Sequence, residues 1–321
     1  MAKNHDHLSI TDVRPENFQE LKEIVLQQAE HHECDYAGDD DRFLQEILDH
    51  QKPCHVILAR RDSDNRILGY LLYSENYGAN GHELYMEDLA VDRNIRRQGV
   101  GQKLLNHLIE LAHERDCDAI SWVVTANNTN AKSFYTGKFG AKRKPYQGYE
   151  VDIDLKAQFN AAASHLHVSA LQDKDLDYLS SRADEDDGLS DKELEHIEKA
   201  LSAPHTQILV AKDHLNQPIA LLIANSNFSS FRTVYGYKTE LVEISQDQKE
   251  LHEAFLLLTD QLKKIARNHD HDGHLNIFIH EDSAAQRDFV KAIGATVMTM
   301  SNDPESILEP YGVDATMFLS K

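Results

Sequence analysis

Apolar and polar positions along the first half of the chain follow two periods, which predict strands and helices in turn. Short apolar runs and single-residue alternation predict strands, whereas apolar residues three or four apart predict helices. The clearest helix carries Leu104, Leu105 and Leu108 on one broad apolar face. The predicted strands are 8–13, 54–61, 67–74, 83–92, 119–125 and 149–155, and the predicted helices begin near Pro15 and after Asp41 or span 101–114 and 129–138. This order predicts an α/β fold with a mixed sheet flanked by helices.

The same pattern returns in the second half of the 321-residue chain. The apolar strand around Ile57 has an echo around Ile208, and Gly140-Ala141 returns as Gly294-Ala295. The order of the matches is kept and their spacing drifts slowly, as expected for a duplicated unit. We therefore predict two tandem copies of one domain, residues 1–157 and 165–321, although a chance likeness of two α/β domains is the alternative.

Composition excludes several classes of protein. The 33 basic and 54 acidic side chains give a formal net charge of −21, which disfavours binding to nucleic acids or anionic membranes and favours cationic ligands. Cys34, Cys54 and Cys117 lie far apart without a CxxC pair, which argues against a disulfide scaffold or a cysteine metal site. No apolar run approaches the ~20 residues of a membrane span, and residues 1–20 lack a signal-peptide core. We expect a cytoplasmic protein.

A glycine-containing loop with three arginines stands out in this acidic chain. It joins the strand 83–92 to the helix 101–114 and reads Arg93-Asn-Ile-Arg96-Arg97-Gln-Gly99-Val-Gly101. Glycines at a strand-to-helix turn let successive backbone N–H groups face one concavity, and the helix N-terminus adds its positive dipole end. The loop lacks the Lys-Ser/Thr of a P-loop and the spacing of the dinucleotide fingerprint. It is predicted to hold a diphosphate, the alternative being an ordinary turn with solvated arginines.

Arg96-x-x-Gly99-x-Gly101 at this position resembles the acetyl-CoA signature of the GNAT superfamily of N-acetyltransferases. The segment 127–135 and Phe139-Gly140-Ala141 resemble the next helix of that family and its end. Within the superfamily, 84–91 and Ser133-Phe134-Tyr135 are similar to the spermidine/spermine (diamine) acetyltransferase group. The resemblance implies a tandem GNAT fold, acetyl-CoA as cosubstrate and no metal.

The resemblance also implies roles for individual residues. It places at the acetyl-CoA site Leu89, Ala90, Val91, Arg96, Arg97, Gln98, Gly99, Val100, Gly101, Gln102, Asn128, Thr129, Asn130, Ala131 and Lys138. Tyr135 matches the family tyrosine beside the thioester sulfur, and Glu87 matches the carboxylate on the amine side. An alkyl amine with a pKa of about 10 must lose a proton before it attacks, and the leaving thiolate must gain one. A carboxylate and a phenol can do this, although packing of Tyr135 and plain solvation of Glu87 are the alternatives.

The second copy departs from the motif. Phe289 stands where the first copy has Tyr135, and the loop 245–250 has no glycine and carries Asp247 and Glu250 where arginines stood. A diphosphate would meet repulsion there. We therefore expect this copy to support the fold, to complete the amine site across the interface, or to bind another partner.

The leading hypothesis is acetyl transfer from acetyl-CoA to a primary amine of a small cationic acceptor such as a diamine or polyamine. Acetylation of protein lysines, N-termini or aminoglycosides, and a non-catalytic CoA-binding scaffold, are the alternatives. A protein acceptor or a homodimer is a further possible partner. Histidines at 269–274 form a polar turn or, less expectedly, a metal site.

Overall fold

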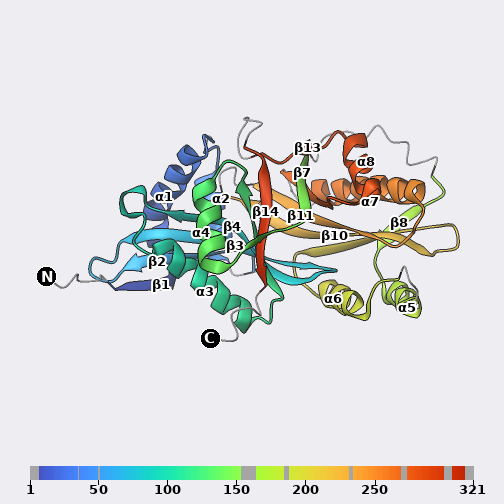
Figure 1. The fold of residues 1–321 in the computed structure, drawn as a ribbon, viewed down its shortest axis with the longest axis horizontal. Helices are drawn as coiled ribbons and strands as arrows, with labels where there is room; N and C mark the ends of the chain where they lie inside the picture. The colour runs from blue at the N-terminus through green and yellow to red at the C-terminus, as the bar shows by residue number, and fades with distance from the viewer. Residues whose placement is uncertain are drawn as a thin grey trace.

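Two seven-stranded sheets lie side by side along the long axis of the molecule (Figure 1). The computed structural model describes residues 7–34, 36–49, 51–152, 164–183, 188–230, 234–268, 273–299 and 306–314. The first sheet has the strand order β1-β2-β3-β4-β5-β14-β6 and the second the order β13-β7-β12-β11-β10-β9-β8. We call each sheet with its helices a lobe, lobe 1 and lobe 2. The predicted linker and most of the 269–274 histidine segment lie outside the described residues.

Lobe 1 follows the elements that the hydrophobic pattern predicts, with small changes at their ends. Its strands are β1 (Leu8–Asp12), β2 (Cys54–Arg61), β3 (Ile67–Gly78), β4 (Gly81–Val91), β5 (Ala119–Thr125), β14 (Leu308–Asp314) and β6 (Lys142–Arg143). Its helical segments are η1 (Pro15–Asn17), α1 (Phe18–His31), α2 (Asp40–Leu48), η2 (Arg93–Ile95), α3 (Val100–Glu114) and α4 (Thr129–Phe139). Neighbouring strands are antiparallel except β4 and β5, which are parallel.

Lobe 2 repeats this plan. Its strands are β13 (Thr296–Val297), β7 (Tyr146–Asp152), β12 (His274–His280), β11 (Val234–Glu243), β10 (Pro218–Ser229), β9 (Thr206–Lys212) and β8 (His167–Ala170). Its helices are α5 (Asp173–Ser181), α6 (Asp191–Leu201), α7 (Gln248–Asn268) and α8 (Ala284–Ala292). Only β11 and β12 pair in parallel among these strands, which matches β4 and β5 of lobe 1. The α/β fold of two mixed sheets flanked by helices agrees with the expectation from sequence.

The two lobes exchange a strand. The sequence places the strand 149–155 in the first copy, but β7 pairs along its whole length with β12 of lobe 2. In return, β14 from the end of the chain lies between β5 and β6 of lobe 1. The chain crosses from one sheet to the other within Lys144-Pro145, directly after β6. The prediction that this strand joins the first sheet is therefore wrong. The place beside β5 is taken by β14, which comes from the other half of the chain.

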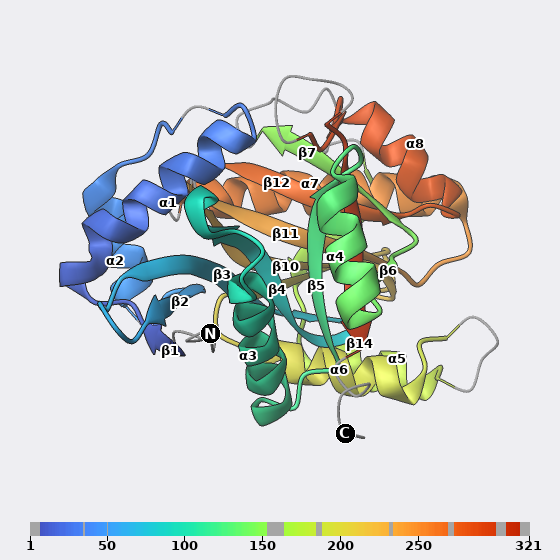
Figure 2. The ribbon, with the colours of Figure 1, turned by 60° about the vertical axis from the view of Figure 1, so that its left-hand side comes forward.

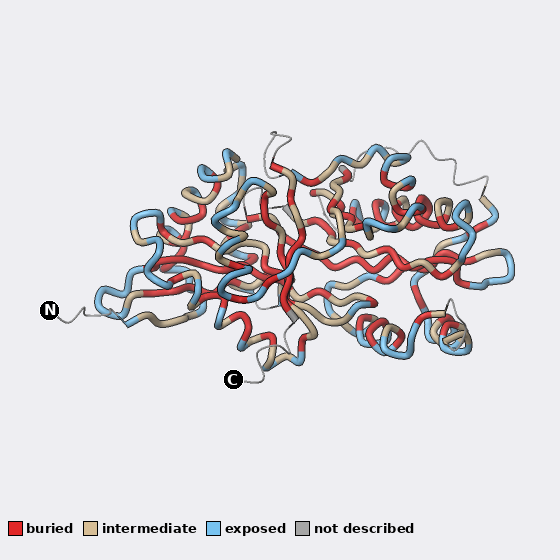
Figure 3. The backbone as a smooth tube through the Cα atoms, in the orientation of Figure 1, coloured by how far each residue is buried: buried red, intermediate tan, exposed pale blue. Residues whose placement is uncertain are grey.

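Helices cover both faces of each sheet. In lobe 1, α3 and α4 pack on the face that presents Leu84 and Trp122, whereas α1 and α2 pack on the face with Tyr70 and Leu72. Figure 2 shows α3 and α4 on the near side of the first sheet. In lobe 2, α7 and α8 cover one face and α5 and α6 the other. The strands in the middle of both sheets are accordingly buried (Figure 3).

Polar contacts hold the lobes together where β3 meets β10. The Asn225 side chain of β10 accepts from the backbone N of Tyr77 at 3.0 Å and donates to its O at 2.9 Å. The buried His196 ring of α6 lies 3.1 Å from the backbone O of Ala79. Phe228 of β10 is part of the lobe 1 core formed by α1 and α2. Lobe 2 therefore contributes an aromatic side chain to the core on the α1–α2 side of the first sheet.

The strand exchange predicts that the first half of the chain does not fold stably when it is isolated. A chain ending at residue 157 would lack all seven β14 partners of β5, and its own β7 would have no sheet to join. We expect no cooperative thermal unfolding of this fragment by circular dichroism, whereas the full chain unfolds cooperatively. Adding residues 306–314 as a peptide should restore part of the transition. A cooperative transition of 1–157 alone, at the melting temperature of the full chain, would contradict the assigned exchange.

Candidate active site

A cleft opens where β4 and β5 separate. The two strands pair only from Glu83 to Tyr85 and from Ala119 to Ser121, and their carboxyl-terminal ends diverge. The cleft between these ends has a volume of about 910 Å³. The register of β4 against β3 shifts at the mouth of the cleft, so that Glu87 is an extra residue in a β-bulge. A bulge bends the strand and redirects side chains, and here it turns β4 away from β5.

The N-terminus of α3 faces this cleft. Gly99 is its N-cap with φ 86°, a left-handed conformation that glycine adopts without strain. Having no side chain, Gly99 leaves the first N–H groups of the helix uncapped, and the first intrahelical bond runs from Lys103 N to Gly99 O at 3.0 Å. Uncapped N–H groups and the helix dipole together form an anion site. Gly99, Val100, Gly101 and Gln102 all line the cleft.

The arginine loop before α3 is held by a buried carboxylate. Asp92 is 2% exposed, and it accepts from Asn94 N at 3.0 Å and from Arg66 Nη2 at 2.6 Å. Arg96 Nε donates to Val91 O at 3.4 Å, which directs this part of the loop toward the cleft. The guanidinium groups of Arg96 and Arg97 therefore add positive charge beside the uncapped helix.

Most residues that the sequence selected come together here. The cleft is lined by Glu87, Leu89, Val91, Arg96, Arg97, Gly99, Val100, Gly101, Gln102, Asn128, Asn130, Ala131, Tyr135 and Lys138. Three others do not line it: Ala90 packs on the opposite face of the sheet, and Gln98 and Thr129 are exposed. The alternation of a strand explains Ala90, because its neighbours Leu89 and Val91 point the other way.

Tyr135 lies at the inner end of the cleft, on α4. Its ring is 8% exposed, with its centroid 4.7 Å from that of Trp122 and 5.2 Å from that of Phe134. Burial and the nearby Asp88 carboxylate raise the pKa of the phenol well above its ordinary range. Tyr135 therefore keeps its proton at neutral pH and can donate it only to a group that develops negative charge.

Glu87 has a raised pKa, near the pH at which a general base has to work. Burial, and secondarily the neighbouring Asp88, raise the pKa of Glu87 to about 8, against the opposing effects of Lys238 and Ser74. Ser74 Oγ lies 3.3 Å from Glu87 Oε1. The Lys238 ammonium belongs to β11 of lobe 2, so the second half of the chain acts on the charge of this carboxylate.

Asp88 is a site residue that sequence reasoning missed. It lines the same cleft, its pKa is raised to about 6 by burial, and its carboxylate accepts from Ser230 Oγ of lobe 2. In a regular strand, the next residue after Glu87 would face the other way, so only the bulge brings both acids to one site. The pair Glu87-Asp88 was visible in the sequence, but no glycine or proline there signals the bulge.

Helix α1 contributes a further wall that the sequence did not assign. Gln28, His31 and His32, at the C-terminal end of α1, line the cleft, and Arg93 of the arginine loop pairs with Glu30 of the same helix. Burial, His31 and Arg96 lower the pKa of His32 to about 4, so this imidazole is neutral at physiological pH. Because the His32 ring beside Arg96 is neutral, it adds no positive charge, and the guanidinium groups supply the positive charge of the loop.

The equivalent helix terminus in lobe 2 is already occupied by a carboxylate of the chain. Asp247 Oδ1 accepts from the backbone N of Lys249 at 2.9 Å and of Glu250 at 3.0 Å, at the start of α7. Phe289, in the place of Tyr135, is fully buried and packs 5.7 Å from Phe255 between ring centroids. Lobe 2 thus has an internal anion where lobe 1 offers open N–H groups.

The described residues contain no cluster of three or more His, Cys, Asp and Glu side chains arranged to hold a metal ion. Among the helices formed by these residues, none combines the length and apolar character needed to cross a membrane.

Known proteins share this arrangement. Residues 18–141 match the model of the Acetyltransferase (GNAT) family. A tandem GNAT protein from the clavulanic acid biosynthesis pathway superposes with a TM-score of 0.55 at 13% identity, covering 96% of this chain and 99% of that one. The GCN5-related N-acetyltransferase from Sphaerobacter thermophilus superposes with a TM-score of 0.56 at 11% identity, covering 98% and 97%. The chain has a tandem GNAT fold.

The tandem GNAT likeness in structure spans both lobes, whereas the family model matches residues 18–141 of lobe 1. The thialysine N-epsilon-acetyltransferase of Bos taurus is 31% identical over 70 residues, which cover 22% of this chain and 41% of that protein. The chain therefore aligns with less than half the length of this curated relative. The shared fold fixes the architecture, and the chemistry has to be argued from the cleft itself.

The raised pKa of Glu87 predicts how stability depends on pH. Between its ordinary value of 4.5 and about 8, the unfolded chain releases this proton while the native protein retains it, so stability falls as pH rises through this window. Glu87→Gln removes this loss and should stabilise the protein at pH 8 by about 1 kcal/mol or more. Urea unfolding at pH 5.5 and pH 8 measures the effect. Glu16→Gln, at an exposed position, is the control, and equal pH slopes in wild type and Glu87→Gln would contradict the assignment.

Proposed function

We propose that lobe 1 is an N-acetyltransferase that transfers the acetyl group of acetyl-CoA to a primary amine of a small molecule. The observation that carries this proposal is the uncapped N-terminus of α3, which opens between Arg96 and Arg97 into the same cleft as Tyr135 and Glu87. A diphosphate fits these N–H groups, and the diverging edge of β4 at Leu89 offers backbone groups to the pantetheine arm. The match of residues 18–141 to the GNAT family supports the same cosubstrate.

Acetyl-CoA supplies an acyl thioester, and the side chains of the cleft handle the protons. The Glu87 carboxylate takes a proton from the ammonium of the acceptor, directly or through a water. The neutral amine attacks the carbonyl, the new C–N bond forms, and the C–S bond breaks. Tyr135 donates a hydrogen bond and then its proton to the departing sulfur, whose own affinity for a proton is raised by the same burial. The second proton that the nitrogen loses on forming the amide returns to the Tyr135 phenolate through water, and Glu87 releases the first proton to solvent. The products are an N-acetylated amine and free CoA thiol.

The acceptor is proposed to be a small cationic amine. The net charge of −21 favours a cationic ligand. The bovine relative is a thialysine N-epsilon-acetyltransferase, and a small amine as its acceptor is consistent with this proposal. Similarity to the diamine acetyltransferase group keeps diamines and polyamines as candidates.

The two proposed catalytic residues predict distinct kinetic defects. Tyr135→Phe should lower kcat about 100-fold with the affinity for acetyl-CoA unchanged, because only the proton on sulfur is lost. In wild type, kcat should rise with pH toward an apparent pKa near 8, and Glu87→Gln should abolish this rise. Release of free thiol from acetyl-CoA, measured across a panel of amines, reports both effects.

Tyr178→Phe, in α5 of lobe 2, is the matched control for the loss of a phenol. CoA binding without turnover of any amine would overturn the enzymatic proposal and favour a CoA-binding scaffold. A Tyr135→Phe variant with wild-type kcat would remove the phenol from the mechanism.

The proposed diphosphate site predicts a position-dependent effect of arginine charge. Arg96→Gln should weaken CoA binding about 10-fold, since a charge-assisted hydrogen bond contributes about 1.5–3 kcal/mol. Arg93→Gln removes the same charge from the same loop, but Arg93 pairs with Glu30 and does not line the cleft. Calorimetry at two salt concentrations should therefore show a loss only for Arg96→Gln, and equal losses in both variants would indicate general charge attraction instead.

A further inference from the structure

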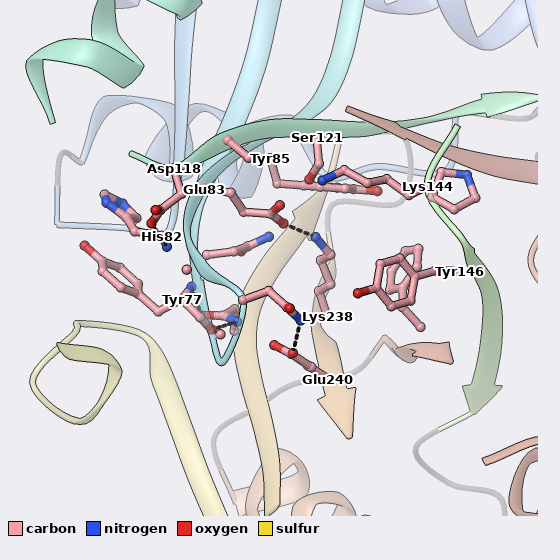
Figure 4. Close-up of a pocket in the computed structure, with 18 of the residues that line it drawn as sticks. Tyr77, His82, Glu83, Tyr85, Asp118, Ser121, Lys144, Tyr146, Lys238 and Glu240 are labelled. Carbon is pink, nitrogen blue, oxygen red and sulfur yellow. Dashed lines mark hydrogen bonds and ion pairs between the residues drawn. The ribbon is translucent and has the colours of Figure 1, made fainter. Parts of the chain in front are cut away.

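A second cavity, of about 450 Å³, lies between the two lobes (Figure 4). Lobe 1 contributes the hairpin of β3 and β4, and lobe 2 contributes β11 and Phe278 of β12. The crossover segment Lys144-Pro145-Tyr146 and Tyr311 of β14 complete the wall. The strand exchange therefore forms the cavity, which neither half of the chain could build alone.

A buried amide in this cavity has no partner in the protein. Asn76 of β3 is 3% exposed, and within the described part of the chain neither its Nδ2 nor its Oδ1 makes a hydrogen bond. A buried polar group left unpaired costs about 1–3 kcal/mol, so such a group indicates a ligand or an ordered water. Asn76 pairs in register with Glu83 of β4, which also lines the cavity. Its amide is thus a donor and an acceptor available to a polar ligand.

Charged groups of both signs surround the same space. Lys238 of β11 forms an ion pair with Glu83, and its Nζ lies 4.0 Å from the ring centroid of Tyr85. Glu240 accepts from Asn80 Nδ2 at 2.7 Å, and burial together with Glu83 raises its pKa to about 7. Figure 4 shows Lys144 and Glu240 on opposite sides of the cavity. Besides the Lys238–Glu83 ion pair, the cavity presents the ammonium group of Lys144 and the carboxyl groups of Glu240 and Asp118.

The cavity adjoins the proposed catalytic carboxylate. Trp122 lines both the cavity and the cleft. The Lys238 ammonium lowers the pKa of Glu83 in the cavity and opposes the rise in the pKa of Glu87 in the cleft, so it lies close to both. Glu83 and Glu87 are four residues apart on β4, a span of about 13 Å or less given the bulge. A ligand that contacts both sites must therefore be extended.

We propose that the cavity binds the carboxylate and α-amino group of an amino acid whose side-chain amine extends to Glu87 and is acetylated there. This inference rests on the proposed function and assigns lobe 2 to acceptor recognition. Lys144 and the Asn76 amide bind the carboxylate, and Glu240 binds the α-ammonium group. A diamine has no anionic group for Lys144 and is repelled by it, so the cavity selects a basic amino acid over the diamine of the same length.

The test compares each amino acid with its decarboxylated counterpart. L-lysine is paired with 1,5-diaminopentane and L-ornithine with 1,4-diaminobutane, and both binding (calorimetry in the presence of CoA) and kcat/KM are measured. We expect at least one amino acid to exceed its diamine about 10-fold in both. Lys144→Gln should reduce this preference about 10-fold, because it raises the KM of the amino acid and removes the repulsion of the diamine, while kcat for the amino acid stays unchanged. Lys142→Gln, at an exposed position of β6, is the matched control.

Two results would overturn the inference. One is a diamine that binds as well as or better than its amino acid in both pairs, and the other is an equal effect of Lys144→Gln on both members of a pair. Calorimetry reads the cavity without turnover, so amino-acid binding lost in Lys144→Gln supports the inference even if no amine is acetylated. Absence of turnover with retained CoA binding would instead refute the proposed function.

Discussion

The antiparallel pairing of β14 with β5 is the interaction on which both candidate sites depend. β5 leaves β4 after Ser121, so beyond that point its hydrogen bonds must come from its other edge. β14 supplies them along all seven residues of β5, from Ala119 to Thr125. A strand supported on one edge can diverge from its neighbour on the other without leaving backbone groups unpaired. The cleft is therefore stable because a strand from the far end of the chain holds its outer wall.

The two lobes share one fold but differ at the helix terminus that could bind an anion. In lobe 1, glycine at the N-cap of α3 leaves N–H groups open to a ligand, and in lobe 2 Asp247 closes the equivalent groups of α7. An internal carboxylate there stabilises the helix and removes its capacity for an external anion. Lobe 2, freed from that role, still reaches the site of lobe 1 through Ser230 and Lys238. Lobe 2 thus contributes side chains to the site of lobe 1, although its own helix terminus is closed.

The sequence predicted the elements well because each of them is amphipathic over its own length. Alternation and helical spacing depend only on which face is buried, and the boundaries of β5 and α4 follow from them within a residue. The same local signal cannot say which sheet a strand joins. Tyr149 and Val151 alternate with polar residues, a pattern that fits a strand of either sheet. The hydrophobic pattern therefore could not reveal that β7 joins lobe 2.

The phosphate loop was recognisable because glycine and arginine are rare types with specific uses at a strand-to-helix turn. The acceptor side was not, because it is made of common residues brought together from distant segments. Glu83 and Lys238 are 155 positions apart, and each alone resembles an ordinary solvated charge on a strand. Asp88 was missed for a different reason: its place in the site depends on one extra residue in the ladder, which no side chain announces.

Several carboxyl groups around the lobe interface are buried away from water, which disfavours their ionised form. Burial raises the pKa of Glu87, Asp88 and Glu240 alike, so the ionisation of each group lowers the stability of the folded protein. A fold selected for stability alone would replace such groups with apolar residues of similar volume. Three acids with this shift, Glu87 and Asp88 in the cleft and Glu240 in the cavity, are instead suited to accept protons and cationic groups. These carboxyl groups therefore make the interface between the lobes less stable than apolar residues would. The proposed chemistry accounts for this cost, because it needs carboxyl groups that no fixed cation neutralises.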